Sequence, residues 1–421
     1  MNRSTASLHE RIVTSVLIGL AGLLPVWIVL AHRGVAPTLL AMGLVVATRG
    51  DIWRTGIRYF VSKPDWSSPL ARAGVFFFAF CLWTGITGLW APRADAPRLA
   101  LDILLPVLAG GAVIWEISRR APERLALFGK CLAYGGAAAI VLIAFEAASS
   151  GFLRAVIPPA DVLPGRTRDM IALGRGATVV TITVFAALTL FYRYVPSRPA
   201  IAVLALAALF AAIRLEIFSN VAGLALGGLV FWAALKAPQI TLTILGAVIL
   251  AALLLAPLAM FIPVELAIAE LSGRIPISWL QRLAIWRASG ELAVGCLPLG
   301  CGADYARAVH ALHEKIAIPG APAPLSVMPV HPHNLFLQIW MEFGLPGFAL
   351  FGAALVNAVR AARLAPLSRL ETAALAASAA SFLVSALVEA SLWQLWRLSA
   401  PLLAGMFIAA ARRKRLLGQA P

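Results

Sequence analysis

The sequence predicts an all-α membrane protein, a polytopic integral helix bundle of about twelve transmembrane helices with one large extramembrane loop between helices 9 and 10. Three observations predict this class. Of the 421 residues, 61% are hydrophobic and only 13% are charged, whereas about a quarter of the residues in a soluble domain are charged. Apolar runs of about 18 residues or more recur along the whole chain, and a helix of that length crosses a bilayer. The long alternation of polar and apolar residues that an outer-membrane barrel requires is missing.

The apolar runs divide the chain into three parts. We expect transmembrane helices 1–9 within residues 1–262, a loop with short helices at 263–333, and helices 10–12 with a basic tail at 334–421. The first run resembles a signal peptide, but it is too long and lacks a small-residue cleavage site, so we interpret it as a retained helix. The predicted spans are 12–31, 34–48, 73–90, 99–117, 125–147, 171–192, 200–217, 218–235, 240–262, 334–355, 372–390 and 392–411.

The formal net charge of +16 has two explanations. Nucleic-acid binding is one, but the basic residues lie in short loops between apolar runs, and such loops stay on the cytoplasmic side of a membrane. We therefore expect the lipid bilayer, and no nucleic acid, as a partner. The basic short loops and the cluster Arg412–Arg415 place both chain ends in the cytoplasm. The expected location is a bacterial inner membrane, with the large loop in the periplasm.

The loop at 263–333 is the largest polar segment, and loops of that length usually carry function. Its first part has helical spacing around 277–286, and its proline-rich last part, 318–332, should be irregular. Cys296 and Cys301 lie in this loop. A periplasmic location would permit a disulfide between them, but two free thiols fit the sequence equally well.

Histidines end the loop. His333 precedes Asn334 and a long apolar run, so it should lie at an outward-facing helix N-terminus, with Asn334 as a possible N-cap. The positive end of the helix dipole favours neutral imidazole, and a neutral imidazole can accept a proton as a general base. His331 is close enough to share this role. The alternative is that Pro332 and Asn334 simply start a helix and the histidines are incidental.

Arginines on the same side suggest an anionic substrate. Arg175 lies between two glycines at the outer end of a span, where a charge is costly unless it faces a cavity or a partner. Alternatively it extends to the interface. Arg282 and Arg287 are five residues apart, so only one of them should face a given site. The planar guanidinium suits pyrophosphate. For this pair, a surface helix with an ion pair to Glu291 is the competing interpretation.

Two other kinds of function have some support in the sequence. His310, His313, His331 and His333 provide imidazoles for a metal site, but the two pairs are far apart in sequence, so we expect no metal and no other cofactor. A transporter should show paired repeats, broken helices and ionisable groups near the membrane midplane. The few candidate groups, including Lys130 and Glu389, lie mostly near span ends, which favours an enzyme.

The motif around His333 resembles a known family. His333–Asn334, then nine residues, then Gly344–Gly347 is similar to the His-Asn/Ser/Gln, nine-residue, Gly-x-x-Gly motif of the O-antigen ligases, which share a superfamily with O-antigen polymerases. His331, the segment 335–338, the segment 282–286, Pro298–Gly302 and the Arg175 region also resemble that family. One departure is the lack of the arginine that family members often carry after a serine near the start of a middle span. Here Asn220 follows Ser219, and the sequence leaves open whether Arg214 or Asn220 replaces that arginine.

The resemblance implies a metal-independent, inverting, membrane-embedded glycosyltransferase. It implies a glycan donor linked to undecaprenyl pyrophosphate and, for a ligase, a lipid A-core acceptor. A polymerase would instead join lipid-linked repeat units. Carried over to this sequence, the resemblance makes His333 the catalytic residue. Substrate binding is expected from Arg175, Arg282, His331, Asn334 and Gln338.

Overall fold

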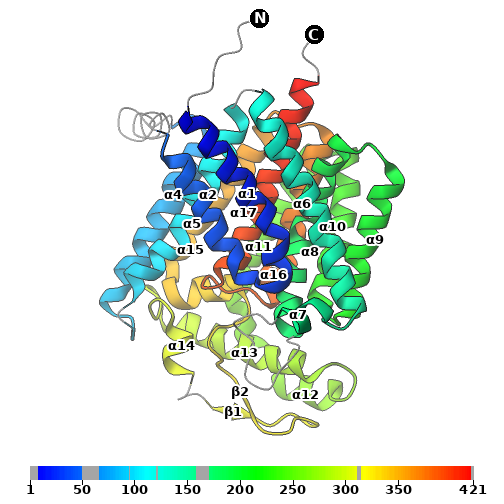
Figure 1. Ribbon diagram of the computed structural model, residues 1–421. Helices are drawn as coiled ribbons and strands as arrows, with labels where there is room; N and C mark the ends of the chain where they lie inside the picture. Colours follow the sequence, from blue (N-terminus) through cyan, green and yellow to red (C-terminus); the bar gives the residue numbers. More distant parts are fainter. Residues whose placement is uncertain are drawn as a thin grey trace, which may run out of the picture.

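The computed structural model describes residues 8–49, 66–93, 95–119, 122–157, 170–310 and 314–418. Long helices run side by side, both chain ends lie at one end of the bundle, and a smaller helical lobe caps the other (Figure 1). The long helices are α1 (Leu8–Leu30), α2 (Val35–Ala47), α4 (Pro69–Ile86), α5 (Ala96–Arg119), α6 (Pro122–Ala148), α8 (Met170–Tyr194), α9 (Arg198–Arg214), α10 (Phe218–Lys236), α11 (Pro238–Leu255), α15 (Leu335–Leu364), α16 (Arg369–Val388) and α17 (Leu395–Leu417).

The all-α class is confirmed, since 81% of the structure is helical. Each of the twelve predicted spans coincides with one of the long helices, and nine helices among the described residues are long and apolar enough to cross a membrane. α2 has only 13 residues. At 1.5 Å per residue it extends about 20 Å, which is less than the roughly 30 Å of a hydrocarbon core. α9, with 17 residues, is also shorter than the other spans.

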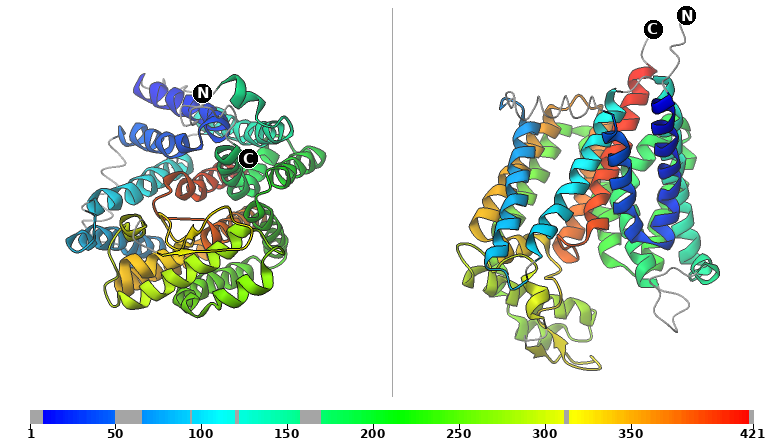
Figure 2. Two further views of the ribbon diagram at one scale, coloured as in Figure 1. Left: turned by 90° about the horizontal axis from the view of Figure 1, so that it is seen from below. Right: turned by 60° about the vertical axis from the view of Figure 1, so that its left-hand side comes forward.

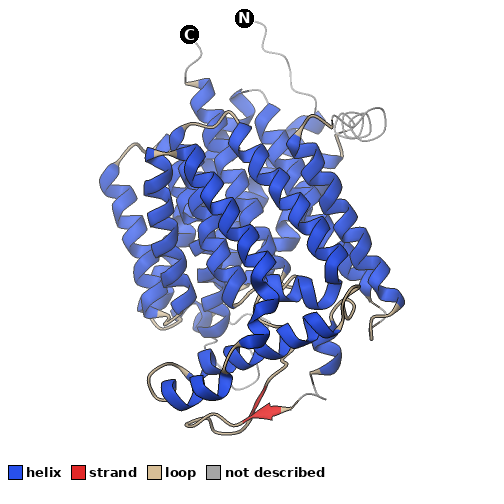
Figure 3. Ribbon diagram, turned by 180° about the vertical axis from the view of Figure 1, so that it is seen from behind, coloured by secondary structure: helices blue, strands red, loops and turns tan. Residues whose placement is uncertain are grey.

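The lobe contains α12 (Val264–Leu271), α13 (Ile277–Gly295), α14 (Tyr305–Val309) and a two-stranded antiparallel sheet of β1 (Lys315–Ile316) and β2 (Leu325–Ser326). This small sheet is the only strand structure in the described residues (Figure 3). Seen along the bundle, the lobe covers one side of the bundle's end, away from α1 (Figure 2). The helical spacing expected at 277–286 is confirmed by α13.

α8 is the central helix of the bundle. It packs against α17, α6, α16, α9 and α1, and most of its residues from Ala172 to Phe191 are buried. Thr178 and Thr183 bond back to carbonyls four residues earlier, so their hydroxyls are satisfied within an apolar core. α8 therefore holds Arg175, one turn from its lobe-side end, on a rigid support.

A break divides α15 at Gly344, whose φ of 58° and ψ of −153° are accessible essentially only to glycine. The loop 298–302 fills the break. Leu345 N–H donates to Pro298 O, and the N–H groups of Cys301 and Gly302 donate to Met341 O and Glu342 O. The Trp83 indole N–H donates to Phe343 O. The freed backbone groups are thereby paired, as burial requires.

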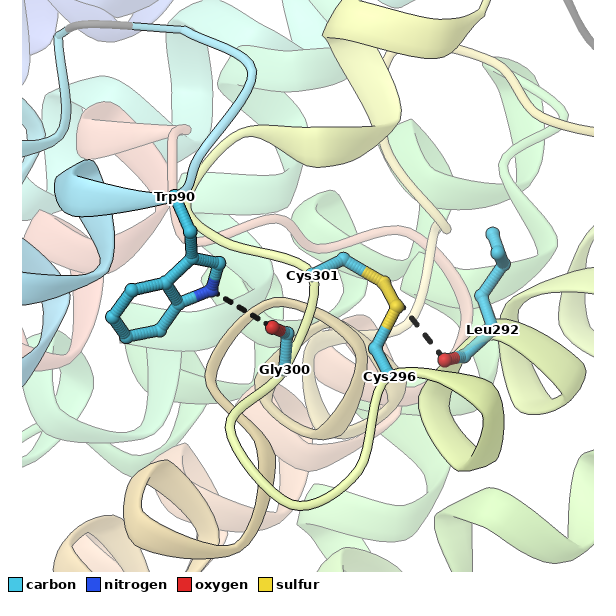
Figure 4. Close-up of a disulfide and its surroundings, with 5 residues drawn as sticks. All are labelled: Trp90, Leu292, Cys296, Gly300 and Cys301. Atoms are coloured by element: carbon cyan, nitrogen blue, oxygen red, sulfur yellow. Dashed lines mark hydrogen bonds between the residues drawn. A yellow bond between two sulfur atoms is a disulfide. The ribbon is translucent and has the colours of Figure 1, made fainter.

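Cys296 and Cys301 form a disulfide that closes this loop (Figure 4). The Trp90 indole N–H donates to Gly300 O in the same loop. The structure thus resolves the choice between disulfide and free thiols in favour of the disulfide. It anchors the segment that fills the α15 break, so the first half of α15, residues 335–343, has a fixed direction beside the lobe.

Candidate active site

The start of α15 positions the histidines. Asn334 is the N-cap of α15, and its Oδ1 accepts hydrogen bonds from the N–H groups of Phe336 and Leu337, both at 3.0 Å. His333, directly before the cap, has a φ of 56°. This left-handed conformation costs roughly 1–3 kcal/mol for a residue other than glycine. The chain thereby turns the His333 ring away from the helix axis and into a cavity.

The cavity has a volume of about 430 Å³ and lies where α8, α13 and the α16–α17 junction meet. The side chains that give it chemical character are two imidazoles, three guanidiniums, a carboxylate and an amide. They belong to His331, His333, Arg175, Arg282, Arg397, Glu389 and Gln394. Apolar residues of α8 and of the α9–α10 turn, together with Gly174 and Thr178, complete the wall. Residues far apart in the sequence therefore form one site.

The cavity carries an excess of positive charge. Glu389 is its one carboxylate among the described lining residues, and it accepts hydrogen bonds from Ser219 Oγ at 2.7 Å and from Arg397 Nη2 at 3.3 Å. Arg397 also donates to Ser385 Oγ. Arg175 lines the cavity, and no ion pair or side-chain hydrogen bond joins its guanidinium to another described residue. The site is therefore suited to an anion with several oxygen acceptors.

Arg282 enters the cavity from the lobe. Its guanidinium lies over the Trp279 ring at 5.4 Å, and its Nε is buried with no hydrogen-bond partner among described residues. Burial lowers the pKa of Arg282 from its usual value. A buried guanidinium with an unused donor is costly until a ligand accepts that hydrogen bond.

His333 is held as a neutral base. Burial, and next the nearby Arg282 guanidinium, lower the pKa of His333 to about 4. The imidazole is therefore unprotonated at neutral pH, and its ring makes no hydrogen bond with described residues. A ring nitrogen of His333 is available to accept a proton from a substrate hydroxyl.

His331 has a different role, because both of its ring nitrogens are engaged. Its Nδ1 accepts the backbone N–H of His333 at 3.2 Å, so the proton of the neutral ring lies on Nε2. Nε2 is 3.3 Å from the side-chain amide of Gln394, whose Oε1 is buried and otherwise unpartnered among the described residues. A half-turn of that amide lets Oε1 accept from Nε2–H and satisfies both groups. His331 thus supports the strained His333 backbone and cannot readily act as a base.

Acidic pH should destabilise the protein through these two rings. Burial lowers the pKa of His331 to about 2 and that of His333 to about 4, from 6.5. As pH falls, the unfolded chain binds protons first, so this stability is present above pH 6.5 and is lost as pH falls toward 4. We expect the melting temperature of the wild type to fall more between pH 7 and pH 4.5 than that of His333→Asn. Equal falls in both proteins would contradict the burial of a neutral His333.

Gln338 links the His333 helix to the opposite wall of the cavity. Its amide N–H donates to Glu342 Oε1 at 3.0 Å, and its Oε1 accepts the backbone N–H of Leu392 at 2.9 Å. Glu342 Oε2 accepts the backbone N–H of Asp304. Gln338, Glu342 and Asp304 are all buried. This network fixes the α16–α17 junction, and with it Glu389 and Gln394, relative to α15.

Gln338→Leu should therefore destabilise the fold. The substitution leaves the Glu342 carboxylate with one donor fewer and the Leu392 N–H unpaired, which should lower the free energy of unfolding by about 3 kcal/mol. Thermal unfolding in detergent measures the loss. Gln239→Leu is the matched control, because Gln239 is exposed and its side chain bonds only with Arg363 among the described residues. A melting temperature equally unchanged in both variants would show that the network contributes little.

The structure separates the residues singled out in the sequence. His331, His333, Arg175 and Arg282 come together in the cavity. Asn334 and Gln338 do not line it, and their side chains are bonded within the protein as described above. Their placement therefore favours a supporting role over the expected direct contact with substrate. Arg287 instead pairs with Glu265 and Glu291, which agrees with the expectation that only one of the two arginines faces the site.

Sequence reasoning missed three cavity residues. Arg214 and Asn220 were the candidates to replace the missing family arginine, but Arg214 is exposed and neither residue lines the cavity. The third guanidinium comes from Arg397 of α17. Its position within an apolar run was a signal, since a charge there is costly without a function or a partner. Glu389 was noted only as a transporter candidate. Gln394 carried no signal. Of the histidines considered for a metal site, His313 lies outside the described residues.

Part of the chain matches a known protein family. A family model described as O-antigen ligase matches residues 217–352. This part of the chain is therefore similar to the O-antigen ligases. The matched segment contains Arg282, His331, His333 and the Gly344 break, so the resemblance seen in the motif is confirmed. Three cavity residues lie outside the matched segment, and the fold brings them to the same cavity: Arg175, Glu389 and Arg397. A search of curated proteins gave no match. The similarity to O-antigen ligases and the apolar helices together support a multi-pass membrane protein with a function of the ligase/polymerase type.

Proposed function

We propose that the protein transfers a glycan from undecaprenyl pyrophosphate to a sugar of the lipid A core. The observation that carries the proposal is the convergence of three guanidiniums and a neutral imidazole on one cavity. The His333 motif matches the ligase form in full, which favours lipid A-core over a second lipid-linked repeat unit as acceptor. A polymerase would use the same cavity and is the alternative.

In the proposed reaction, Arg175 and Arg282 hold the pyrophosphate. Arg397, which is bonded to Glu389, adds positive charge to the cavity. An acceptor hydroxyl attacks the anomeric carbon of the donor sugar on the face opposite the pyrophosphate. The new carbon–oxygen bond forms as the bond to the pyrophosphate oxygen breaks, which inverts the configuration. His333 takes the hydroxyl proton, and the guanidiniums stabilise the charge that develops on the leaving pyrophosphate. The positive charge that stabilises the leaving group comes from side chains, so the proposed reaction needs no metal.

The proposed orientation places the cavity and lobe in the periplasm and both chain ends in the cytoplasm, in a bacterial inner membrane. Basic residues at the ends of α8, α10, α16 and α17 that lie toward the chain termini support it, namely Arg193, Lys236, Arg369 and Arg415. The disulfide of the lobe also supports it, because disulfides persist in the periplasm and are rare in the cytosol.

The test uses purified protein with undecaprenyl-pyrophosphate-linked glycan, lipid A-core and EDTA, and follows the glycan on a gel. Transfer onto the core lipid is expected. Glycan that lengthens while still attached to undecaprenyl pyrophosphate would establish the polymerase alternative instead. If neither product forms, while the same protein moves the lipid-linked glycan across a vesicle membrane, the enzyme assignment is wrong.

A further inference from the structure

A second large cavity lies at the end of the bundle that carries the chain termini. It has a volume of about 610 Å³ and is lined mostly by apolar side chains of α8, α9 and α10, including Phe185, Leu188, Ile201, Ala205 and Phe231. We call it the α8–α10 groove. None of its lining residues belongs to the candidate active site. Its wall on α8 begins about two turns beyond Thr178, the last α8 residue of the active-site cavity.

The groove exists because α9 and α10 have different packing partners. α9 packs mainly on α6 and α8, whereas α10 packs mainly on α16. Near its lobe-side half, α10 approaches α16 closely through glycines: Ser381 Oγ donates to Gly223 O, and a Cβ at Gly227 would collide with Phe185 and Ser381. The hairpin of α9 and α10 is thus held in place near its turn, and the space between the two helices toward the chain termini is left open.

Three basic residues lie in or next to this groove. Arg198 lines it, and the exposed Lys236 and Arg369 are the chain neighbours of the lining residues Leu235 and Leu370. None of these three cations has an ion pair with described residues. The nearest carboxylate in sequence, Glu371, is already engaged by Arg193 and Arg415. A site with an apolar floor and an unpaired cationic mouth suits an amphiphile with an anionic head.

We propose that the α8–α10 groove binds an anionic phospholipid. One acyl chain fills the space between α9, α10 and α8, and the phosphate lies at the mouth near Arg198, Lys236 and Arg369. In the orientation proposed above, this lipid belongs to the cytoplasmic leaflet. The choice of leaflet rests on the proposed function. The bound chain supplies the contacts that α9 and α10 do not make with each other, and it therefore stabilises the bundle around α8.

The test is thermal unfolding of the full-length protein in a mild detergent, titrated with phosphatidylglycerol or with phosphatidylcholine of the same acyl chains. We expect a saturable rise in melting temperature with phosphatidylglycerol and a clearly smaller one with phosphatidylcholine. Arg198→Gln should weaken the response to phosphatidylglycerol about 3- to 10-fold in midpoint concentration, as loss of one charge near a lipid headgroup predicts. Ala205→Trp, which fills the groove from an exposed position, should abolish it. Arg98→Gln is the control, since Arg98 is an exposed arginine on α5 far from the groove.

Equal responses to the two lipids, or a response unchanged in both groove variants, would overturn the proposal. If Ala205→Trp does not fold, the headgroup comparison and Arg198→Gln still decide. A rise produced by undecaprenyl pyrophosphate but not by phosphatidylglycerol would assign the groove to the donor's tail instead, and a concentration-dependent dimer lost in Ala205→Trp would assign it to a second copy. Glycan transfer in the same variants is measured separately, so failure of this proposal is distinguishable from failure of the proposed function.

Discussion

His333→Asn is expected to reduce glycan transfer by roughly 10²- to 10⁴-fold, the usual contribution of a general base. Asparagine is chosen because it tolerates the left-handed backbone that His333 adopts, with its φ of 56°. The variant thus removes the imidazole without adding backbone strain, which His333→Ala would do. Turnover of the purified enzyme at saturating donor measures the effect.

The control for this variant is His310→Asn. His310 is an exposed lobe histidine whose Nδ1 contacts Arg307 O, and it does not line the cavity. Its turnover should equal that of the wild type. His333→Asn with turnover within a few-fold of the wild type would exclude His333 as the base and would direct attention to Glu389, the one carboxylate of the cavity among the described residues.

Arg175→Lys is expected to lower kcat/KM for the donor roughly 10- to 100-fold. Lysine keeps the charge but loses the planar fork that makes paired hydrogen bonds to phosphate oxygens. A hydrogen bond to a charged group contributes about 1.5–3 kcal/mol, and about 1.4 kcal/mol corresponds to tenfold. Steady-state kinetics with varied donor concentration give the value, and KM for the donor should rise.

Arg214→Lys is the matched control for Arg175→Lys. Arg214 lies at the end of α9 near the same part of the chain, but it is exposed and outside the cavity. It should leave kcat/KM unchanged. If kcat/KM fell as much in Arg214→Lys as in Arg175→Lys, Arg214 and not Arg397 would be the third arginine of the family.

The sequence predicted the parts of the site that depend on local pattern. An imidazole next to a helix start, an arginine between glycines at a span end and an arginine in a loop helix each carried a signal of their own. The fold class followed from hydropathy, because a bilayer requires each spanning segment to satisfy its own backbone. Helix length was the weaker part, since the apolar run at 34–48 forms a helix too short to span alone.

The remaining features depend on contacts between distant segments. The Gly344 break needs the loop 298–302 and Trp83 to pair its backbone groups, and the sequence showed the glycine but not the partners. The support of His333 by His331 and Gln394 depends on how the α16–α17 junction folds back on α15. Arg397 and Glu389 pair across that junction, and no spacing rule links them to Arg175. Tertiary packing therefore decides which polar residues face the cavity.

We propose that the cationic cavity recognises the pyrophosphate of a lipid-linked donor. Equilibrium binding of undecaprenyl pyrophosphate, undecaprenyl phosphate and undecaprenol to the purified protein tests it most directly, with Arg175→Lys alongside the wild type. We predict that affinity falls in that order, that Arg175→Lys loses most of the preference for pyrophosphate, and that His333→Asn binds pyrophosphate like the wild type. Equal affinity for all three lipids in the wild type would show that the cavity does not recognise the pyrophosphate.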